Sequence, residues 1–192
     1  MAITFFDDFA DLSQWTNNGG VSIAPAGFAY HPGDGSGGGG LHRPQGTAKA
    51  VEVGVYGDAS GGDNWLTVKL NGDGTQPLYN SDGDGLLLRS TNGQVSFFSS
   101  GGTATPTFYL PVPPQSAGTL VRVGVYVPAS GHILLYYNRA QVGELTGGGA
   151  YGGNQVQLGG YNGIGAHFDY ALLSDEPLTM FDFLPHATGE TY

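Results

Sequence analysis

Apolar and polar residues alternate along most of the chain, and turn-forming residues interrupt the alternation at short intervals. The clearest stretch runs from Leu120 to Leu173. It contains alternating runs at 120–127, 132–137, 140–145, 155–158 and 167–173, separated by Pro-Ala-Ser-Gly, Asn-Arg and glycine-rich segments. A period of two places the apolar side chains on one face of a strand. The stretch therefore predicts a meander of antiparallel strands with one buried face.

A strand-like hexapeptide occurs twice in the chain. The sequence Val51-Glu-Val-Gly-Val-Tyr56 matches Val121-Arg-Val-Gly-Val-Tyr126 except at the second position. In each copy the three valines fall on one face of a strand, and the charged residue, the glycine and the tyrosine fall on the other. We expect the two strands to play equivalent parts, with two comparable sheets sharing the core.

Three further segments have readable local signals. Asn92-Gly93 between the runs 86–90 and 94–98 predicts a hairpin, because this dipeptide readily adopts positive φ. The proline-rich segment 105–114 cannot form a central strand, so it predicts an extended loop or a crossover between sheets. Residues 11–15 predict a single helical turn, with Leu12 and Trp15 three positions apart. The aromatic residues around this turn are typical core anchors.

The number and length of these runs define a fold class. Ten to twelve short strands without a long helical pattern predict an all-β protein with very little helix. We expect a two-sheet antiparallel jelly-roll β-sandwich over residues 1–175, followed by a C-terminal extension over 176–192. The apolar residues Met180, Phe181, Phe183 and Leu184 either close the sandwich or dock on a neighbouring chain.

Several segments resemble the concanavalin A-like (LamG-like) jelly-roll superfamily. They are the opening Phe6-Asp-Asp-Phe9 with Leu12-Ser-Gln-Trp15, the strands within 121–142, Val156-Gln-Leu-Gly-Gly-Tyr-Asn-Gly163 and Phe168-Asp-Tyr-Ala-Leu-Leu173. The resemblance covers most of residues 3–175. It implies a concave sheet face, or loops beside it, that binds sugars. Glycine-rich jelly rolls of this kind also resemble minor tail and accessory proteins of bacteriophages.

Composition excludes several function classes. The chain has 35 glycines among 192 residues, six Lys and Arg against 16 Asp and Glu, a formal charge of −10, and no cysteine. So acidic a chain is an unlikely partner for nucleic acid, which needs clustered cations. Disulfides and thiolate metal sites are impossible. The N-terminus lacks the pattern of a signal peptide, and no apolar run approaches about 20 residues, so we expect no membrane insertion.

The glutamates give no sign of catalysis. Relatives of this fold that cleave β-glucans carry a Glu-x-Asp-x-(x)-Glu strand, which places two carboxylates around the sugar bond. None of the four glutamates, Glu52, Glu144, Glu176 and Glu190, lies in such a pattern. The chain also lacks a Gly-x-Ser-x-Gly nucleophile elbow. We therefore predict that the protein is not an enzyme.

One loop has the residue types that calcium prefers. Asn80, Asp82 and Asp84 alternate and are followed by Gly85, as in the first half of a calcium-binding loop. The twelfth position, which is glutamate in such loops, is Thr91 here. The alternatives are a calcium site completed by another residue or a pair of ordinary polar turns.

Tyrosines and asparagines in the later connections are candidate sugar ligands. Aromatic rings stack on sugar faces, and amides bind hydroxyl groups. The candidates are Trp65, Tyr151, Asn154, Tyr161 and Asn162. The alternative is that these rings fill a sheet interface or a subunit contact.

Together these features lead to one leading hypothesis and two alternatives. The first is a non-enzymatic structural and recognition subunit of a bacteriophage virion, tail-associated or decorating. It would assemble with itself and with other virion proteins, and it would bind a host surface glycan. The second is a carbohydrate-binding module of a bacterial surface or extracellular protein. The third is a glycan hydrolase or lyase of the same fold, although fold alone does not fix function.

Overall fold

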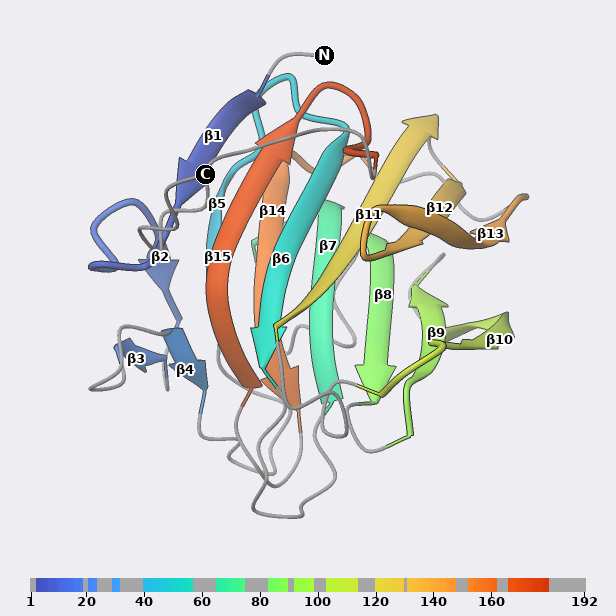
Figure 1. Cartoon of the computed structure of the whole chain (residues 1–192). Coiled ribbons are helices and arrows are strands. Elements are labelled where there is room, and N and C mark those ends of the chain that lie inside the picture. Colours follow the sequence, from blue (N-terminus) through green and yellow to red (C-terminus); the bar gives the residue numbers. More distant parts are fainter. Residues whose placement is uncertain are drawn as a thin grey trace.

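The chain forms two antiparallel β-sheets packed face to face, as the computed structural model in Figure 1 shows. The structure describes residues 3–18, 21–23, 29–31, 40–56, 65–74, 83–89, 92–98, 103–113, 120–129, 131–147, 152–161 and 166–179. These residues contain strands and turns but no helix, which confirms the all-β prediction. No helix long and apolar enough to cross a membrane occurs in this part of the chain.

The strands of the described residues are numbered in chain order. They are β1 (Ile3–Asp7), β2 (Thr16–Asn17), β3 (Ser22–Ile23), β4 (Ala29–His31), β5 (Gly40–Pro44), β6 (Ala50–Tyr56), β7 (Trp65–Gly72), β8 (Asp84–Arg89), β9 (Gln94–Phe98), β10 (Thr103–Tyr109), β11 (Val121–Ala129), β12 (His132–Tyr137), β13 (Ala140–Leu145), β14 (Gln155–Tyr161) and β15 (Ala166–Ser174). The three short strands β2, β3 and β4 bring the number above the ten to twelve expected from the sequence.

The chain passes several times from one sheet to the other, so that strands consecutive in sequence often belong to different sheets. Sheet A has the order β13-β12-β11-β6-β15-β4-β3, with β1 also paired to β15, and sheet B has the order β10-β9-β8-β7-β14-β5-β2. In Figure 1, β15, β6 and β11 of sheet A lie in front of β14, β7 and β8 of sheet B. The predicted two-sheet antiparallel sandwich is confirmed.

The stretch from Leu120 to Leu173 is a meander only in its first half. Strands β11, β12 and β13 are consecutive neighbours in sheet A. Strand β14 then enters sheet B between β7 and β5, and β15 returns to sheet A beside β6. The prediction of a single meander was wrong beyond Leu145. Alternation shows which face of a strand is buried, but it does not show which sheet the strand joins.

The two copies of the repeated hexapeptide lie side by side in sheet A. Strands β6 and β11 pair antiparallel, with Val53 opposite Val123. The two copies thus play equivalent parts within one sheet, and each does not mark a sheet of its own. Their antiparallel register places Glu52 opposite Gly124 and Arg122 opposite Gly54. Each charged side chain thus faces the glycine of the other copy, which leaves room on the outer face of the sheet.

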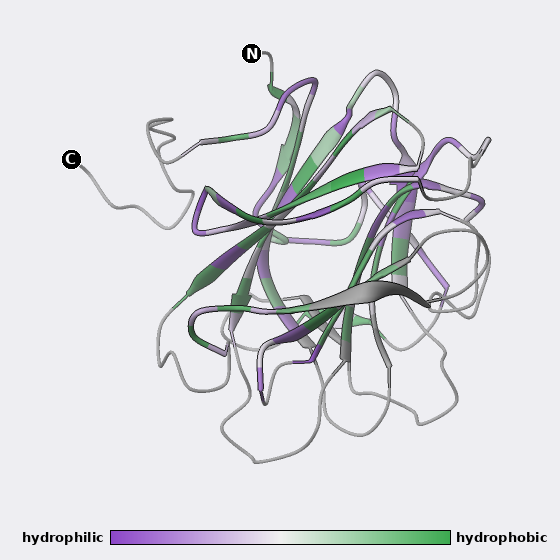
Figure 2. Cartoon of the chain, turned by 90° about the vertical axis from the view of Figure 1, so that its right-hand side faces the viewer, coloured by the Kyte–Doolittle hydropathy of each residue, from purple (hydrophilic) through white to green (hydrophobic). Residues whose placement is uncertain are grey.

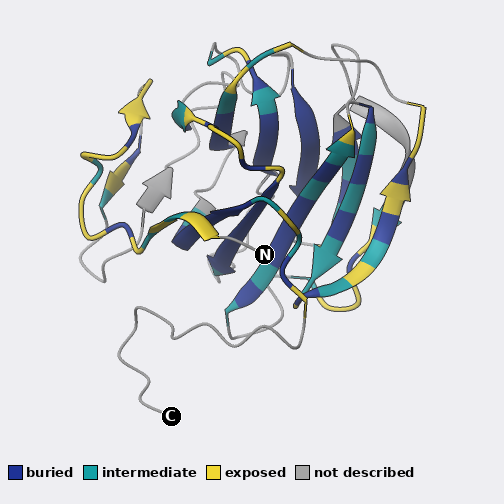
Figure 3. Cartoon of the chain, turned by 90° about the horizontal axis from the view of Figure 1, so that it is seen from above, coloured by how far each residue is buried: buried dark blue, intermediate teal, exposed yellow. Residues whose placement is uncertain are grey.

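The core lies between the sheets. Alternate residues of β6 and β11 (Val51, Val53, Val55, Val121, Val123 and Val125) meet Leu66, Val68, Leu86, Leu88, Val156 and Leu158 of sheet B. All of these side chains are buried. Figure 2 shows hydrophilic and hydrophobic segments alternating along the strands, and Figure 3 shows buried residues concentrated in the central strands. Burying these aliphatic side chains is the main favourable term in folding the sandwich.

The N-terminal aromatic residues anchor the edge of the core. The amide of Trp15 donates to the carbonyl of Leu12 at 3.0 Å, which confirms a single turn over residues 11–15. Phe9 and Trp15 are buried, and the guanidinium of Arg43 lies 3.2 Å from the centroid of the Phe5 ring. Phe6 is different, since it is 41% exposed on the outer face of sheet A.

The proline-rich segment 105–114 was only partly predicted. Residues up to Tyr109 belong to β10, which is an edge strand of sheet B and not a loop. The register of β10 shifts between Ala104 and Thr107, around Pro106. An edge position and a bulge tolerate a proline, because its missing N–H breaks no ladder bond there.

The beginning of the C-terminal extension packs on its own domain. Leu178 is buried against Tyr170 and Leu172, on the outer face of sheet A. Residues 180–192, including the apolar group 180–184 for which docking was predicted, lie outside the described residues. Docking of that group on another chain stays a prediction.

Candidate functional site

The outer face of sheet B is built from strand positions that alternate with the core residues. The backbone register aligns these positions into rows that cross the strands. We name the row at one end the aromatic row; it comprises Tyr109, Gln94, Arg89, Trp65 and Tyr161. Tyr109 pairs with Gln94, Arg89 with Trp65, and Trp65 with Tyr161. Gln94 comes opposite Arg89, because their neighbours Val95 and Leu88 are partners.

The aromatic row spans five adjacent strands, from β10 to β14. At a strand spacing of about 4.8 Å, its length is roughly 19 Å. Tyr109 is 64% exposed, the largest exposure among the large hydrophobic residues in the described part of the chain. Gln94 and Arg89 are half-buried. An exposed ring beside an amide and a guanidinium therefore forms one end of this face.

The turn before β9 fixes the backbone at this end. The amide of Gln94 donates to Oδ1 of Asn92 at 2.9 Å. Gly93 has a φ of 70°, and its carbonyl accepts from the amide of Leu110 at 2.8 Å. This bond ties the β8–β9 turn to the end of β10. The row is therefore held by main-chain bonds, and Tyr109 is not carried on a free loop.

Two more rows follow along the same face. The middle row aligns Ser96, Leu87, Thr67, Gly159 and Gly40. The lysine row aligns Gly85, Lys69, Gln157 and His42. Thr67, Leu87, Lys69 and Gln157 are buried although they do not face the core between the sheets. The middle row and most of the lysine row are thus closed in this structure, and the more accessible residues lie at Tyr109, Gln94 and Arg89 and at His42.

His42 organises the other end of the face. Its Nδ1 lies 3.2 Å from Oε1 of Gln155, and its Nε2 lies 3.3 Å from Oδ1 of Asn18. A neutral imidazole donates to only one of these oxygens, because only one ring nitrogen then carries hydrogen. Asn18 also donates to the carbonyl of Gly74 at 3.1 Å. The result is a half-exposed array of amides around an imidazole.

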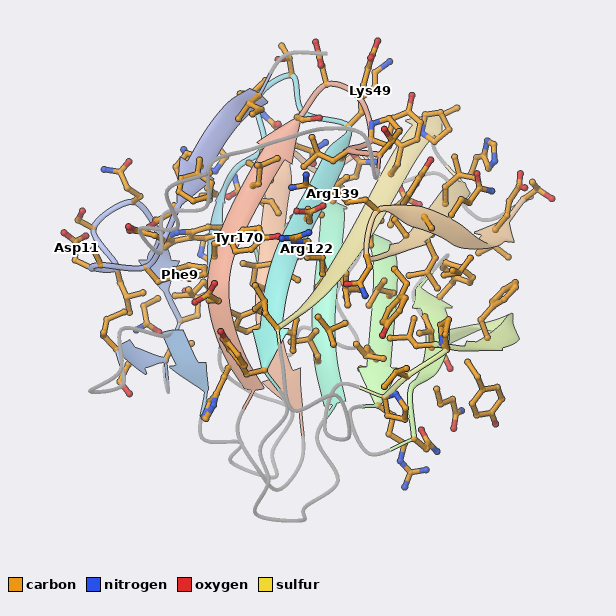
Figure 4. All side chains as sticks on the ribbon, in the orientation of Figure 1. Phe9, Asp11, Lys49, Arg122, Arg139 and Tyr170 are labelled. Atoms are coloured by element: carbon orange, nitrogen blue, oxygen red, sulfur yellow. The ribbon has the colours of Figure 1, made fainter. Side chains whose placement is uncertain are left out.

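The outer face of sheet A has a different chemistry, centred on Glu52. Arg139 donates to Glu52 twice, from Nε to Oε2 and from Nη2 to Oε1, each at 3.0 Å. The hydroxyl of Tyr170 donates to Oε1 at 2.6 Å. All three side chains are buried, and Figure 4 shows Tyr170, Arg122 and Arg139 gathered on the outer side of sheet A near β6. The carboxylate accepts three hydrogen bonds from buried side chains, which is typical of a structural cluster.

The pKa values in this cluster follow from burial and from the charge of Glu52. Burial and the neighbouring carboxylate raise the pKa of the Tyr170 hydroxyl well above its usual value. For Arg139, burial lowers the pKa, but the hydrogen bond and charge of Glu52 outweigh it, so the pKa is raised. The Arg139 guanidinium thus stays charged and the Tyr170 phenol stays neutral throughout the physiological pH range.

The predicted sugar ligands are brought together only in part. Trp65 and Tyr161 are direct partners in the register of β7 and β14. Asn154 is exposed, but it precedes β14 and lies at the other end of that strand from Tyr161. Tyr151 and Asn162 lie outside the described residues. Sugar binding by these residues stays a prediction.

The candidate calcium ligands cannot be placed as a set. Asn80 and Asp82 lie outside the described residues. Asp84 begins β8 and is fully buried, and its Oδ2 accepts from Nδ2 of Asn71 at 2.8 Å. Burial raises the pKa of its carboxyl above the usual value. No group of three or more metal-ligating side chains occurs among the described residues, and the calcium site stays a prediction.

Sequence reasoning missed Tyr109, Gln94 and Arg89. A signal for two of them was present, because the Asn92-Gly93 hairpin already brings the end of β8 opposite the start of β9. Tyr109 carried no such signal, since its segment was interpreted as a loop. Its place beside Gln94 depends on the pairing of β10 with β9.

Comparison with known proteins finds solved structures of similar fold. No protein-family model matches the chain, and no curated protein matches by sequence. Among solved structures, the chain is similar to the β-glucanase of Bacillus licheniformis, at 12% identity and a TM-score of 0.65 over 90% of this chain and 98% of that one. A Bacillus subtilis protein of unknown function with a galectin-like fold shares 14% identity, at a TM-score of 0.64 over 90% and 96%.

A third similar structure is the carbohydrate-binding module CBM66 of Bacillus subtilis. It shares 11% identity, at a TM-score of 0.52 over 83% of this chain and 91% of that one. Identities this low establish the fold alone. The chain therefore has a jelly-roll β-sandwich fold like that of these structures, which agrees with the fold that the sequence resemblance implied.

Proposed function

We propose that this protein is a non-catalytic carbohydrate-binding β-sandwich and that the outer face of sheet B contacts the sugar. The aromatic row carries the proposal. Tyr109 offers an exposed ring, and its partner Gln94 offers an amide on the same face. A ring binds the apolar face of a sugar, while amide and guanidinium groups bind its hydroxyls. The row extends across five strands, which suits a chain of several sugar units.

The fold gives independent but weaker support. Carbohydrate-binding modules and galectin-like domains are among the similar structures. Glucanases of the same fold are similar as well, so the fold is compatible with both binding and cleavage. The choice between them depends on the residues of the face.

The residues of the face favour binding without cleavage. Glycoside hydrolysis generally uses two carboxyl groups about 5–9.5 Å apart. The aromatic, middle and lysine rows contain neither Asp nor Glu at the positions that the register aligns. Glu52, the buried glutamate of the described strands, lies on the other sheet and is held by Arg139.

A finer proposal concerns where the binding takes place. We propose that the chain is a bacteriophage virion subunit, which attaches the particle to a host surface glycan. Its support is the glycine-rich composition without cysteine. The alternative is a module of a bacterial surface or extracellular protein. Detection of the chain in purified particles, as a stable oligomer in light scattering, would support the virion assignment. A monomer that is absent from all particle preparations would contradict it.

Affinity electrophoresis in gels that contain soluble polysaccharides tests the binding. The panel is lichenan, laminarin, dextran, dextran sulfate and polygalacturonate. We expect retardation by at least one of these polymers. The variant Tyr109→Ala should bind that polymer at least about tenfold more weakly, a loss typical of a central aromatic contact. The control Tyr126→Ala changes a half-buried tyrosine on the outer face of sheet A and should keep the affinity.

Two results would overturn the proposal. One is the absence of retardation in every gel although the protein is folded. The other is release of new reducing ends from a retarding polysaccharide, which would show a hydrolase.

A further inference from the structure

Charge is distributed unevenly between the two outer faces. The chain has 16 acidic and six basic residues. Even so, the aromatic, middle and lysine rows on sheet B contain Arg89 and Lys69 and no acid. On the outer face of sheet A, Glu52 and Glu144 accompany Arg122 and Arg139. Among the described strand positions, the outer face of sheet B thus carries basic side chains without an acidic one, whereas the outer face of sheet A carries both.

We propose that the glycan recognised at the outer face of sheet B is anionic and carries carboxylate or sulfate groups. This inference rests on the proposed function and names its class of ligand. Arg89 makes the charged contact, since it is half-buried and lies in the aromatic row between Gln94 and position 65. The ring of Tyr109 and the amide of Gln94 then bind the sugar next to the charged group.

The chemistry of Arg89 suits such a ligand. Its planar guanidinium presents five N–H donors and binds the oxygens of a carboxylate or a sulfate in pairs. Charge-assisted bonds of this kind are about twice as strong as neutral ones. Arg89 already has an interaction within the chain, and five donors allow it to engage a second acceptor.

Lys69 lies in the lysine row of the same face. Its side chain is fully buried and it too interacts within the chain, so it does not touch the ligand in this structure. Salt should weaken the binding of an anionic glycan at this face, because it screens the charge of Arg89.

Matched polysaccharides test the inference. Dextran is compared with dextran sulfate, and polygalacturonate with its methyl ester, each titrated at low and at high salt. We expect the anionic member of at least one pair to bind about tenfold or more tightly than its neutral counterpart, and salt to reduce this preference. Preference for polygalacturonate identifies a carboxylate ligand, and preference for dextran sulfate identifies a sulfate ligand.

Variants distinguish a direct contact between Arg89 and the ligand from an effect of the protein's net charge. Arg89→Gln should lose about tenfold in affinity for the anionic polymer, and Arg89→Lys should lose less, since it keeps the charge without the fork. Arg122→Gln removes the same charge from a half-buried arginine on sheet A and should bind as the wild type does. Thermal melting of each variant verifies the fold.

Three outcomes would overturn the inference. Equal affinity for the neutral polymers, unaffected by Arg89→Gln, would refute the anionic ligand and leave carbohydrate binding intact. No binding to any polymer would refute both. Equally tight binding of duplex DNA would show a general attraction for polyanions in place of recognition of a sugar.

Discussion

Arg139 grips the carboxylate of Glu52 with two hydrogen bonds of 3.0 Å, although 87 positions separate them in the chain. Arg139 sits in the β12–β13 turn with a φ of 66°, next to Asn138 with a φ of 46°. Two successive residues with positive φ form the turn type favoured in two-residue hairpins. The pair thereby fastens the tip of a peripheral hairpin to β6 at the centre of sheet A.

Removing one partner of this ion pair should strongly lower the free energy of unfolding. Arg139→Ala leaves the buried Glu52 carboxylate without its cation, and we expect it to lower the free energy of unfolding by about 3–5 kcal/mol. The double variant Glu52→Leu, Arg139→Met removes both charges and should recover most of that loss. Urea unfolding measures both. A single-variant loss below about 1 kcal/mol would mean that the pair behaves like an exposed salt bridge.

The two glycines of the repeated hexapeptide should differ in tolerance. A Cβ on Gly54 would lie 2.6 Å from Cε1 of Tyr170, whereas a Cβ on Gly124 would lie 3.3 Å from the Cβ of Tyr136. We expect Gly54→Ala to destabilise the fold by about 1–3 kcal/mol, because the Tyr170 ring must move. Gly124→Ala, its matched control, should stay within about 1 kcal/mol of the wild type. Equal unfolding midpoints for the two variants would contradict this packing.

Asp84 should make the free energy of unfolding fall as the pH rises, which is opposite to the usual effect of a carboxyl group. Burial raises the pKa of its carboxyl above the ordinary 3.8, although hydrogen bonds from Asn71 and the Gly131 backbone act against this. The folded state then keeps a proton that the unfolded chain has lost, so this contribution to stability falls as the pH rises above 3.8. Asp84→Asn is neutral throughout and should gain in melting temperature relative to the wild type from about pH 3.5 to pH 7.

The control for this series is Asp11→Asn. Hydrogen bonds from Ser13 lower the pKa of the exposed Asp11 carboxyl, so the variant should lose stability relative to the wild type over the same range. Parallel melting curves for Asp84→Asn and the wild type would contradict the effect of burial. If calcium binds at Asp84, the chelator EDTA lowers the melting temperature of the wild type only.

The sequence predicted the class of fold because alternation and turn chemistry are local. The hairpin at Asn92-Gly93, the turn at Asn138-Arg139 and the core side of each valine strand all followed from neighbouring residues. The sheet to which a strand belongs is not local. This explains why the placement of β14 was wrong, and why the pairing of β6 with β11 and the partnership of Arg139 with Glu52 were not foreseen.

In the candidate site, too, the sequence predicted what depends on neighbouring residues and missed what depends on strand pairing. Trp65 and Tyr161 were selected as aromatic residues with polar neighbours, and the register aligned them. Tyr109 was overlooked because the prolines around it indicated a loop, whereas an edge strand with a bulge accommodates Pro106. A face assembled from five strands is visible only when their pairing is known.

Mapping of the binding face by NMR tests the central claim most directly. The amide resonances of the protein are followed during titration with short fragments of whichever panel polysaccharide retards it most. The proposal predicts shifts concentrated in β10, β9, β8 and β7, around Tyr109, Gln94 and Arg89, with sheet A unchanged. Shifts centred on β6, β11 and β12 of sheet A, with the aromatic row unaffected, would contradict it.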